Sequence, residues 1–219
     1  MKKRVAALAA AAAFCLLFTG CKISFHVVDG SNVDTDPGEV EVKTFSYEGT
    51  VSRISLEQRV GTVTIESGAG EELQVECSYP EKYMPTVTWE DGQLVIGKDA
   101  QETTAEDMDD WYTKITIPQE YTLSEMSLSL ELGDVMLHEI SCKELEAELN
   151  MGDMKLTDSS FSEADIHVDA GDVKGENTAI AAGTVHVDLG DIVLEGDIGN
   201  VKVSTDLGKL SVSSNDPET

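Results

Sequence analysis

The sequence is poor in residues on which many enzymes and most nucleic-acid-binding proteins depend. Of its 219 residues, four are cysteine, five are proline and 15 are Lys or Arg, against 42 Asp or Glu. The formal net charge of -27 repels nucleic acid and the anionic surface of a membrane, which leaves cations, cationic polymers and neutral ligands as compatible partners. No arginine follows Arg59, and no apolar run after residue 21 is long enough to span a bilayer.

Recognisable catalytic motifs are also missing from the chain. It contains no nucleophile elbow, zinc-protease motif or phosphate-binding loop. Enzymes that cleave acidic polysaccharides need a cationic base and charge-neutralising groups, whereas this chain offers scattered lysines on an acidic surface. Close carboxylate pairs occur by chance in so acidic a protein and do not by themselves indicate glycoside chemistry. The sequence therefore favours a non-enzymatic protein, with a polysaccharide-active enzyme as the least favoured alternative.

The N-terminus has the layout of an exported lipoprotein. Residues 2–4 are basic, and the apolar run over residues 5–18 is too short for a permanent transmembrane helix. The run ends in Leu17-Phe18-Thr19-Gly20-Cys21, which resembles the lipobox of bacterial lipoprotein precursors, although Leu is more usual at the position of Phe18. The resemblance implies that residues 1–20 are a cleaved signal peptide. Cys21 would then carry a diacylglycerol thioether that holds the protein on the extracytoplasmic face of the cell membrane.

Short segments with a period of two dominate the rest of the sequence. Residues 21–44 are polar and acidic and are expected to form a lipidated tether, and residues 214–219 are expected to form a flexible tail. The alternating segments cover residues 51–56, 62–65, 73–77, 86–89, 94–96 and 114–117. This alternation is typical of strands, and no sustained helical period follows the signal peptide. We therefore expect an almost entirely β domain.

The strongest pattern is a glycine-centred repeat. Its glycines recur at intervals of 19, 19, 19 and 18 residues. The expected corner residues are Gly133, Asp134, Gly152, Asp153, Gly171, Asp172, Gly190, Asp191 and Gly208. A unit of this length cannot bury its own apolar face, so the units must stack. The sequence thus predicts an all-β parallel β-helix, or β-solenoid, over residues 45–213, with about 19 residues per turn.

Alignment of the repeats assigns side chains to the two faces of each strand. The inward positions before the first aligned corner are expected to be Leu145, Ala147, Leu149 and Met151, with their counterparts in later copies. The short strand after each corner is expected to carry further inward residues, which in the last copy are Leu210 and Val212. Residues 59–63 look like an earlier, degenerate copy. Cys77 and Cys142 could pair outside the cell, but Cys142 aligns with apolar residues, which favours a free buried thiol.

The glycine and aspartate of each corner have separate expected roles. Glycine suits a backbone with positive φ or a close approach between turns. The aspartate after it can accept local backbone amides, as in an Asx turn. A column of four aspartates also invites a calcium interpretation, but the glycine-rich short turns of calcium-binding solenoids are absent. We interpret the column as turn residues that face solvent.

The repeat also resembles a known family. Together with Ile115-Thr116-Ile117-Pro118 and the leucine-rich segment 123–132, it resembles the bacterial putative-adhesin family of β-solenoid domains of unknown function, over about residues 45–213. The resemblance implies a right-handed, single-stranded parallel β-helix. It implies no catalytic residues and no cofactor. It favours binding at the cell surface, and an envelope accessory protein that acts with a membrane-protein partner in surface-stress signalling is the alternative.

One outward column contains candidate metal ligands. His167 and His186 align on successive turns, with Glu148 in the same column and Asp169 and Asp188 two residues after the histidines. Successive turns are about 4.8 Å apart, so two imidazoles and a carboxylate could hold Zn²⁺ or a similar divalent cation. The alternative is a solvated polar face on which like side chains merely stack.

Overall fold

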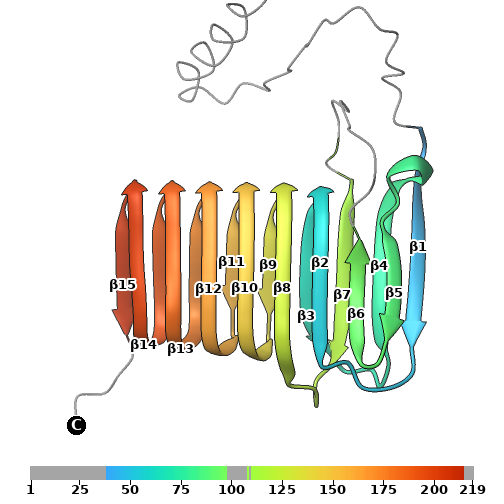
Figure 1. Cartoon of the computed structure of the whole chain (residues 1–219), viewed down its shortest axis with the longest axis horizontal. Coiled ribbons are helices and arrows are strands. Elements are labelled where there is room, and N and C mark those ends of the chain that lie inside the picture. The colour runs from blue at the N-terminus through green and yellow to red at the C-terminus, as the bar shows by residue number, and fades with distance from the viewer. Residues whose placement is uncertain (1–37, 98–107, 109, 215–219) are drawn as a thin grey trace, which may run out of the picture. The chain divides into compact units, whose positions relative to one another are not determined.

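The computed structural model describes residues 38–97, 108 and 110–214 (Figure 1). The predicted signal peptide, Cys21, residues 21–37 of the predicted tether and residues 215–219 lie outside the described residues. The described part is nearly all strand, with a single 3-10 turn at Glu81–Tyr83 and no α-helix. Accordingly, it contains no helix of the length and apolarity needed to cross a membrane.

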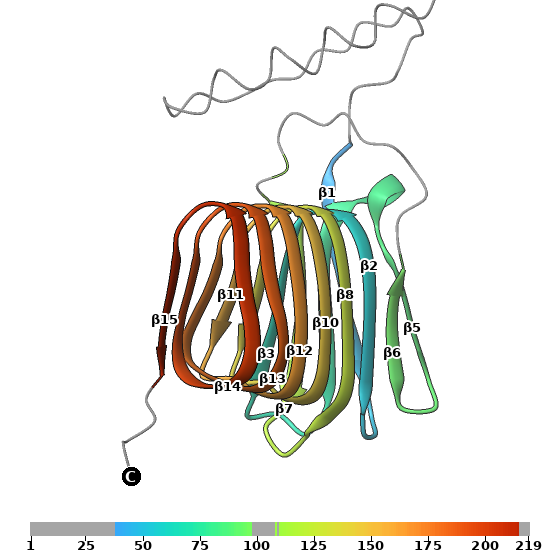
Figure 2. The same cartoon turned by 60° about the vertical axis from the view of Figure 1, so that its left-hand side comes forward.

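The strands coil into a stack that confirms the predicted β-solenoid (Figures 1 and 2). They are β1 (Val40–Tyr47), β2 (Arg53–Val60), β3 (Thr62–Gly68), β4 (Leu73–Pro80), β5 (Thr86–Glu90), β6 (Gln93–Gly97), β7 (Tyr112–Pro118), β8 (Leu123–Leu132), β9 (Val135–His138), β10 (Ser141–Met151), β11 (Met154–Thr157), β12 (Ser160–Ala170), β13 (Val173–Leu189), β14 (Ile192–Leu207) and β15 (Leu210–Ser214). Each regular coil is a long strand, a glycine corner and a short strand. In β13 and β14, the short strand of one coil continues into the long strand of the next.

Parallel pairing between coils keeps equivalent residues of the repeat in register. Ala147 pairs with Ile166, and Ile166 pairs with Val185, so three coils contribute one column to the core. All three side chains are buried. Cys142 lies in a second buried column and is a free thiol, as the alignment favoured.

One predicted inward column is on the outside. Met151 is 52% exposed and Leu189 is 47% exposed, although both continue the alternation of buried residues along their strands. Each is the last residue before a corner glycine, where the backbone leaves the strand and turns. The side chain therefore lies over the outside of the corner, and the alternation holds only within the strand.

The corner glycines allow adjacent coils to approach at backbone level. Gly133, Gly152, Gly171 and Gly190 have φ values of 136°, 141°, 151° and 152°. A Cβ on Gly152 would overlap the carbonyl oxygen of Gly133, and the same conflict recurs at each later corner. Gly208 shares this close approach without a positive φ. Close packing therefore excludes a side chain at all five corners, and backbone conformation does so at the first four.

The corner aspartates bridge coils rather than closing local turns. The Asp134 carboxylate accepts the backbone N–H of Asp153 at 2.8 Å, and Asp153 accepts that of Asp172 at 2.8 Å. The series continues through Asp191, which accepts the N–H of Lys209 at 2.7 Å. The neighbouring corner amides and carbonyls already bond along the stack, so the carboxylate supplies the acceptor that this N–H lacks. This differs from the expected Asx turn.

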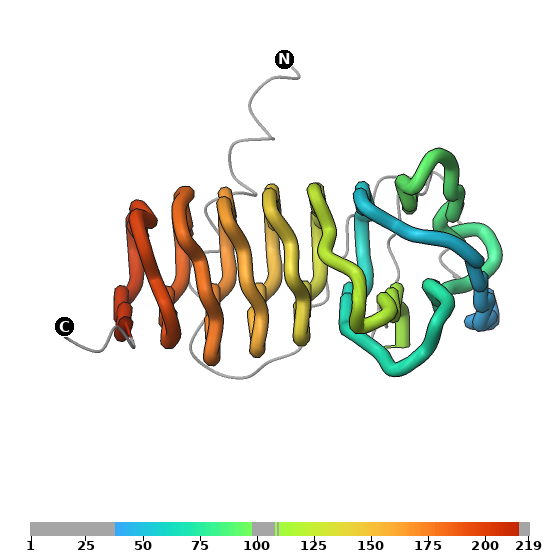
Figure 3. Tube along the Cα trace, turned by 90° about the horizontal axis from the view of Figure 1, so that it is seen from below, coloured from blue at the N-terminus to red at the C-terminus, as the bar shows by residue number. Residues whose placement is uncertain are grey.

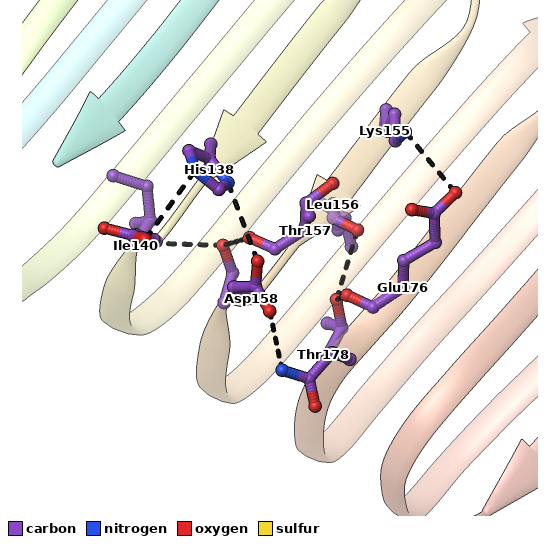
Figure 4. Close-up of polar contacts among 11 residues, drawn as sticks. His138, Ile140, Lys155, Leu156, Thr157, Asp158, Glu176 and Thr178 are labelled. Carbon is purple, nitrogen blue, oxygen red and sulfur yellow. Dashed lines mark hydrogen bonds and ion pairs between the residues drawn. The ribbon is translucent and has the colours of Figure 1, made fainter.

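A second set of corners, on the opposite side of each coil, has no sequence motif. Glu139, Asp158 and Asn177 have φ values of 55°, 51° and 50°, a conformation that Asp and Asn tolerate better than most residues. Asn177 donates to the Asp158 carboxylate at 2.6 Å (Figure 4). The buried Ser159 hydroxyl donates to the carbonyl of Thr157 and accepts the N–H of Ile140 (Figure 4). Side chains therefore complete the backbone hydrogen bonding of these corners.

The N-terminal end of the stack is less regular than the sequence predicted. β2 and β3 pair in parallel with β8 and β9, so residues 59–63 do form an earlier corner. Beyond this coil, however, β4 runs antiparallel to both β7 and β1, and β5 runs antiparallel to β6. β1 begins at Val40, within the range predicted as tether. These antiparallel strands end the parallel ladder and cover the first coils.

Aromatic residues fill the same end. The buried Trp111 lies 5.9 Å from Tyr79 and 5.0 Å from Tyr83, measured between ring centroids. Tyr79 also hydrogen bonds Gln58, and the Thr113 hydroxyl donates to the Gln58 side-chain oxygen at 3.1 Å. The buried polar side chains of Gln58, Tyr79 and Thr113 are therefore paired with one another.

Among the described strands, none covers the C-terminal end of the stack in this way (Figure 3). β14 and β15 form the last described coil, and β14 is the described strand with which β15 pairs. Leu207, Leu210 and Val212 are 63%, 48% and 44% exposed, so the last two are not buried as the repeat predicted. Their counterparts Ile192 and Leu194, one coil earlier, are completely buried because the last coil covers them.

Replacing Gly152 with valine should destabilise the domain by at least about 1 to 3 kcal/mol, because both the positive φ and the Gly133 carbonyl exclude a side chain. Chemical denaturation followed by circular dichroism measures the change. Gly70→Val is the matched control. A Cβ on Gly70 would make only ordinary van der Waals contacts, and the backbone there does not have a positive φ. An unchanged denaturation midpoint for Gly152→Val would show that the corner is not under this constraint.

Ile166→Asp should prevent folding, because the new carboxylate would be buried in the column between Ala147 and Val185 without a partner. Ile166→Val should fold and lose only about 0.5 to 1.5 kcal/mol. Asp165→Ala, on the exposed side of the same strand, is the control and should change stability little. A soluble Ile166→Asp variant with a cooperative unfolding transition would contradict the inward assignment.

Candidate functional site

The two aligned histidines meet on the outward face of the long strands. His167 of β12 pairs in register with His186 of β13. Their rings are stacked, with centroids 5.3 Å apart and planes 19° from parallel. Their side chains are 44% and 28% exposed, so both are reachable from solvent.

Each imidazole has a carboxylate from its own strand. His167 Nε2 lies 2.9 Å from an Asp169 carboxylate oxygen, and His186 Nε2 lies 3.0 Å from an Asp188 carboxylate oxygen. These contacts arise because residues two apart on a strand point to the same side. Asp206 of β14 approaches His186 Nε2 at 4.0 Å.

The structure brings together three of the five predicted ligands. One possible ligand atom from each of His167, His186 and Asp188 lies within 4.8 Å of the other two. Glu148 pairs in register with His167 but is not a member of this group, and Asp169 contacts His167 without being a member either. The arrangement can hold a cation that accepts two nitrogen ligands and one oxygen ligand.

Ser204 belongs to the site and was missed in the sequence. Its hydroxyl lies 2.9 Å from His186 Nδ1, and it pairs in register with His186. The last repeat is one residue shorter, which moves Ser204 to 18 residues after His186. Counting 18 residues instead of 19 from His186 would have identified Ser204 as the next residue of the histidine column.

The two cysteines among the described residues are both buried. Burial raises the pKa of the Cys77 thiol to about 11, and it raises that of Cys142 to about 11 as well. Both are therefore protonated near neutral pH and are poor nucleophiles. One hollow among the described residues, lined by residues such as Ser67, Tyr121 and Glu139, has room for about one water molecule.

Comparisons with known proteins agree with this architecture. Residues 51–218 match the Toastrack DUF4097 family. No curated protein gives a significant match. The match agrees with the resemblance to adhesin-like solenoids that the repeat suggested.

Three of the solved structures that are similar to this chain illustrate the range of similarity. A putative cell adhesion protein from Clostridium sporogenes has a TM-score of 0.50 and 12% identity, over 80% of this chain and 100% of that chain. A putative adhesin from Bacteroides fragilis has a TM-score of 0.46 and 16% identity, over 81% and 99% of the two chains. A putative lipid binding protein from Parabacteroides distasonis has a TM-score of 0.27 and 16% identity, over 81% and 96%.

At sequence identities this low, structural similarity says nothing about the roles of individual residues. The family match is independent evidence, because it covers residues 51–218 and includes every regular coil. The chain therefore belongs to the Toastrack DUF4097 family.

Proposed function

We propose that this protein is a cell-surface lipoprotein whose solenoid is a non-enzymatic binding domain. The lipobox-like residues 17–21 support lipid attachment at Cys21 and an extracytoplasmic location. The raised pKa values of the two buried thiols fit binding rather than catalysis. The similar solved structure from Clostridium sporogenes is named a putative cell adhesion protein, which agrees with this proposal.

The uncovered C-terminal coil is the observation that carries the proposal. Terminal coils of stacked-repeat proteins normally need a cap with a polar outer face. Here Leu210 and Val212 are exposed instead, although their counterparts one coil earlier are buried, and exposed apolar groups that gather in one place mark interaction sites. Over residues 197–214, two lysines (Lys202 and Lys209) balance two acids (Asp197 and Asp206), in a chain with a net charge of -27. This end is therefore less acidic than the chain as a whole.

The occupant that fits this coil is an extended polypeptide segment of a partner protein. Every preceding coil is covered by a strand that pairs in parallel and buries apolar side chains in the core. β14 and β15 present the same strand geometry with their outer edges outside the paired sheet. A segment with alternating apolar residues would add a strand there and cover Leu210 and Val212.

The alternative function is that of an envelope accessory protein. In that case the partner of the C-terminal coil would be a protein of the same membrane, to which the lipid confines the domain. Adhesion would instead require a partner from outside the cell. The identity of the captured partner separates the two functions.

Cys21→Ala should abolish lipid attachment, because it removes the sulfur atom that would form the thioether to diacylglycerol. Metabolic labelling with a fatty-acid probe should mark the wild-type protein and leave the variant unlabelled. Cys77→Ala is the control, since that buried thiol is not expected to carry lipid. Equal labelling of wild type and Cys21→Ala would remove lipid anchoring from the proposal.

A photo-crosslinking residue placed at Leu210 should capture a partner protein on intact cells, because this position lies on the uncovered coil. The same residue at Met136 is the matched control, since Met136 is 38% exposed on a short strand within the stack. Mass spectrometry should map the Leu210 crosslink to an extended segment with alternating apolar residues.

Equal capture at Leu210 and Met136, or capture at neither, would contradict the proposed binding end. If Leu210 captured only another copy of this chain, the C-terminal coil would be a site of self-association and not a site for a different partner protein. A partner that belongs to the same membrane would favour the accessory role over adhesion.

A further inference from the structure

We propose that His167, His186 and Asp188 form a surface site for Zn²⁺ or a similar transition-metal ion. The inference goes beyond the proposed binding function and does not depend on it. It rests on two imidazoles and a carboxylate that the strand register brings to one place.

The distances between the candidate ligand atoms are close to those of a zinc site. Zinc bonds to nitrogen and oxygen are about 2.0 to 2.2 Å long, so two ligands of a tetrahedral ion lie about 3.3 Å apart. His186 Nε2 and the Asp188 oxygen are already 3.0 Å apart. The ligand atom of His167 lies within 4.8 Å of both. Because the side chains are partly exposed, a small rotation of the His167 ring can close the remaining gap.

Ser204 supports the tautomer that metal binding requires. A neutral imidazole carries its proton on one nitrogen and offers the lone pair of the other to the metal. The Ser204 hydroxyl oxygen lies 2.9 Å from His186 Nδ1 and can accept a proton donated from there. This contact would leave the Nε2 lone pair facing Asp188 and the proposed ion. Hydrogen bonds of this kind orient metal-binding histidines in proteins.

The surrounding charges favour a cation at this position. Asp169 and Asp206 add two carboxylates beside the three ligands, at 2.9 Å and 4.0 Å from the respective Nε2 atoms. Lys202, two residues before Ser204 on β14, is the nearby basic residue on the same face. Three protein ligands would leave one position of a tetrahedral ion for water, as is usual for an accessible site.

His138 is an exposed histidine that lacks such a site. His138 lies 3.7 Å from Glu139 and 3.9 Å from Asp158 (Figure 4), yet no second imidazole joins it in a ligand group among the described residues. It has the same type of acidic surroundings without the histidine pair. His138 therefore provides a matched control.

Calorimetric titration of the full chain with Zn²⁺ should give one ion per chain. His167→Ala and His186→Ala should each weaken binding at least tenfold, while His138→Ala should leave it unchanged. Ser204→Ala, which removes only the contact to Nδ1, should weaken binding by about tenfold. Thermal unfolding without metal should be similar for all four variants, because the changed side chains are exposed or partly exposed.

Titration with Co²⁺ provides a second measurement, because intense visible absorption reports a tetrahedral site with imidazole ligands. That absorption should appear with wild type and be lost in His167→Ala. Absence of Zn²⁺ binding, or equal binding by wild type and the His167 and His186 variants, would overturn the proposal. Binding of Ca²⁺ in preference to Zn²⁺ would also overturn it, since carboxylates alone would then account for the affinity.

Discussion

The contact between successive glycine corners governs the rest of this structure. Each corner glycine packs against the backbone of the glycine one coil earlier, so closely that no side chain fits between them. The carboxylate of the aspartate that follows accepts a hydrogen bond from the equivalent backbone N–H of the next coil. The glycine sets the spacing and the aspartate fixes the register. A slip of one residue would break both, and it would also turn the core side chains outward.

Fixed register has a consequence for charge. Like residues of the repeat are stacked, as with Glu125, Glu144 and Glu163 on the outward face. Two unit charges one coil apart repel by only about 0.9 kcal/mol in water, and salt reduces this further. The hydrophobic burial of each coil outweighs a penalty of this size. The same stacking that tolerates the glutamates brings His167 and His186 into ring contact.

The regular coils could be predicted from the sequence because one local pattern repeats and each copy must bury the same face. Prediction failed where a residue depends on contacts outside its own repeat. Met151 follows the alternation but lies at a corner and is exposed. Glu139 adopts a positive φ, although no glycine in the sequence indicates a turn at this position. The antiparallel cap was missed because alternation identifies strands but not their direction. For the histidine site, alignment placed His167 and His186 together, while the shortened last repeat concealed Ser204.

The two ends of the stack differ in the way each terminates the ladder. At the N-terminal end, antiparallel strands and the aromatic group around Trp111 cover the first coils. At the other end the fifth corner has Lys209 in place of aspartate. Among the described residues no further corner amide is available to donate to a carboxylate at this position, so the residue that joins coils is absent from the last described corner. The backbone edge and the exposed Leu210 and Val212 nevertheless remain, and a partner strand can use them without reproducing the glycine corner.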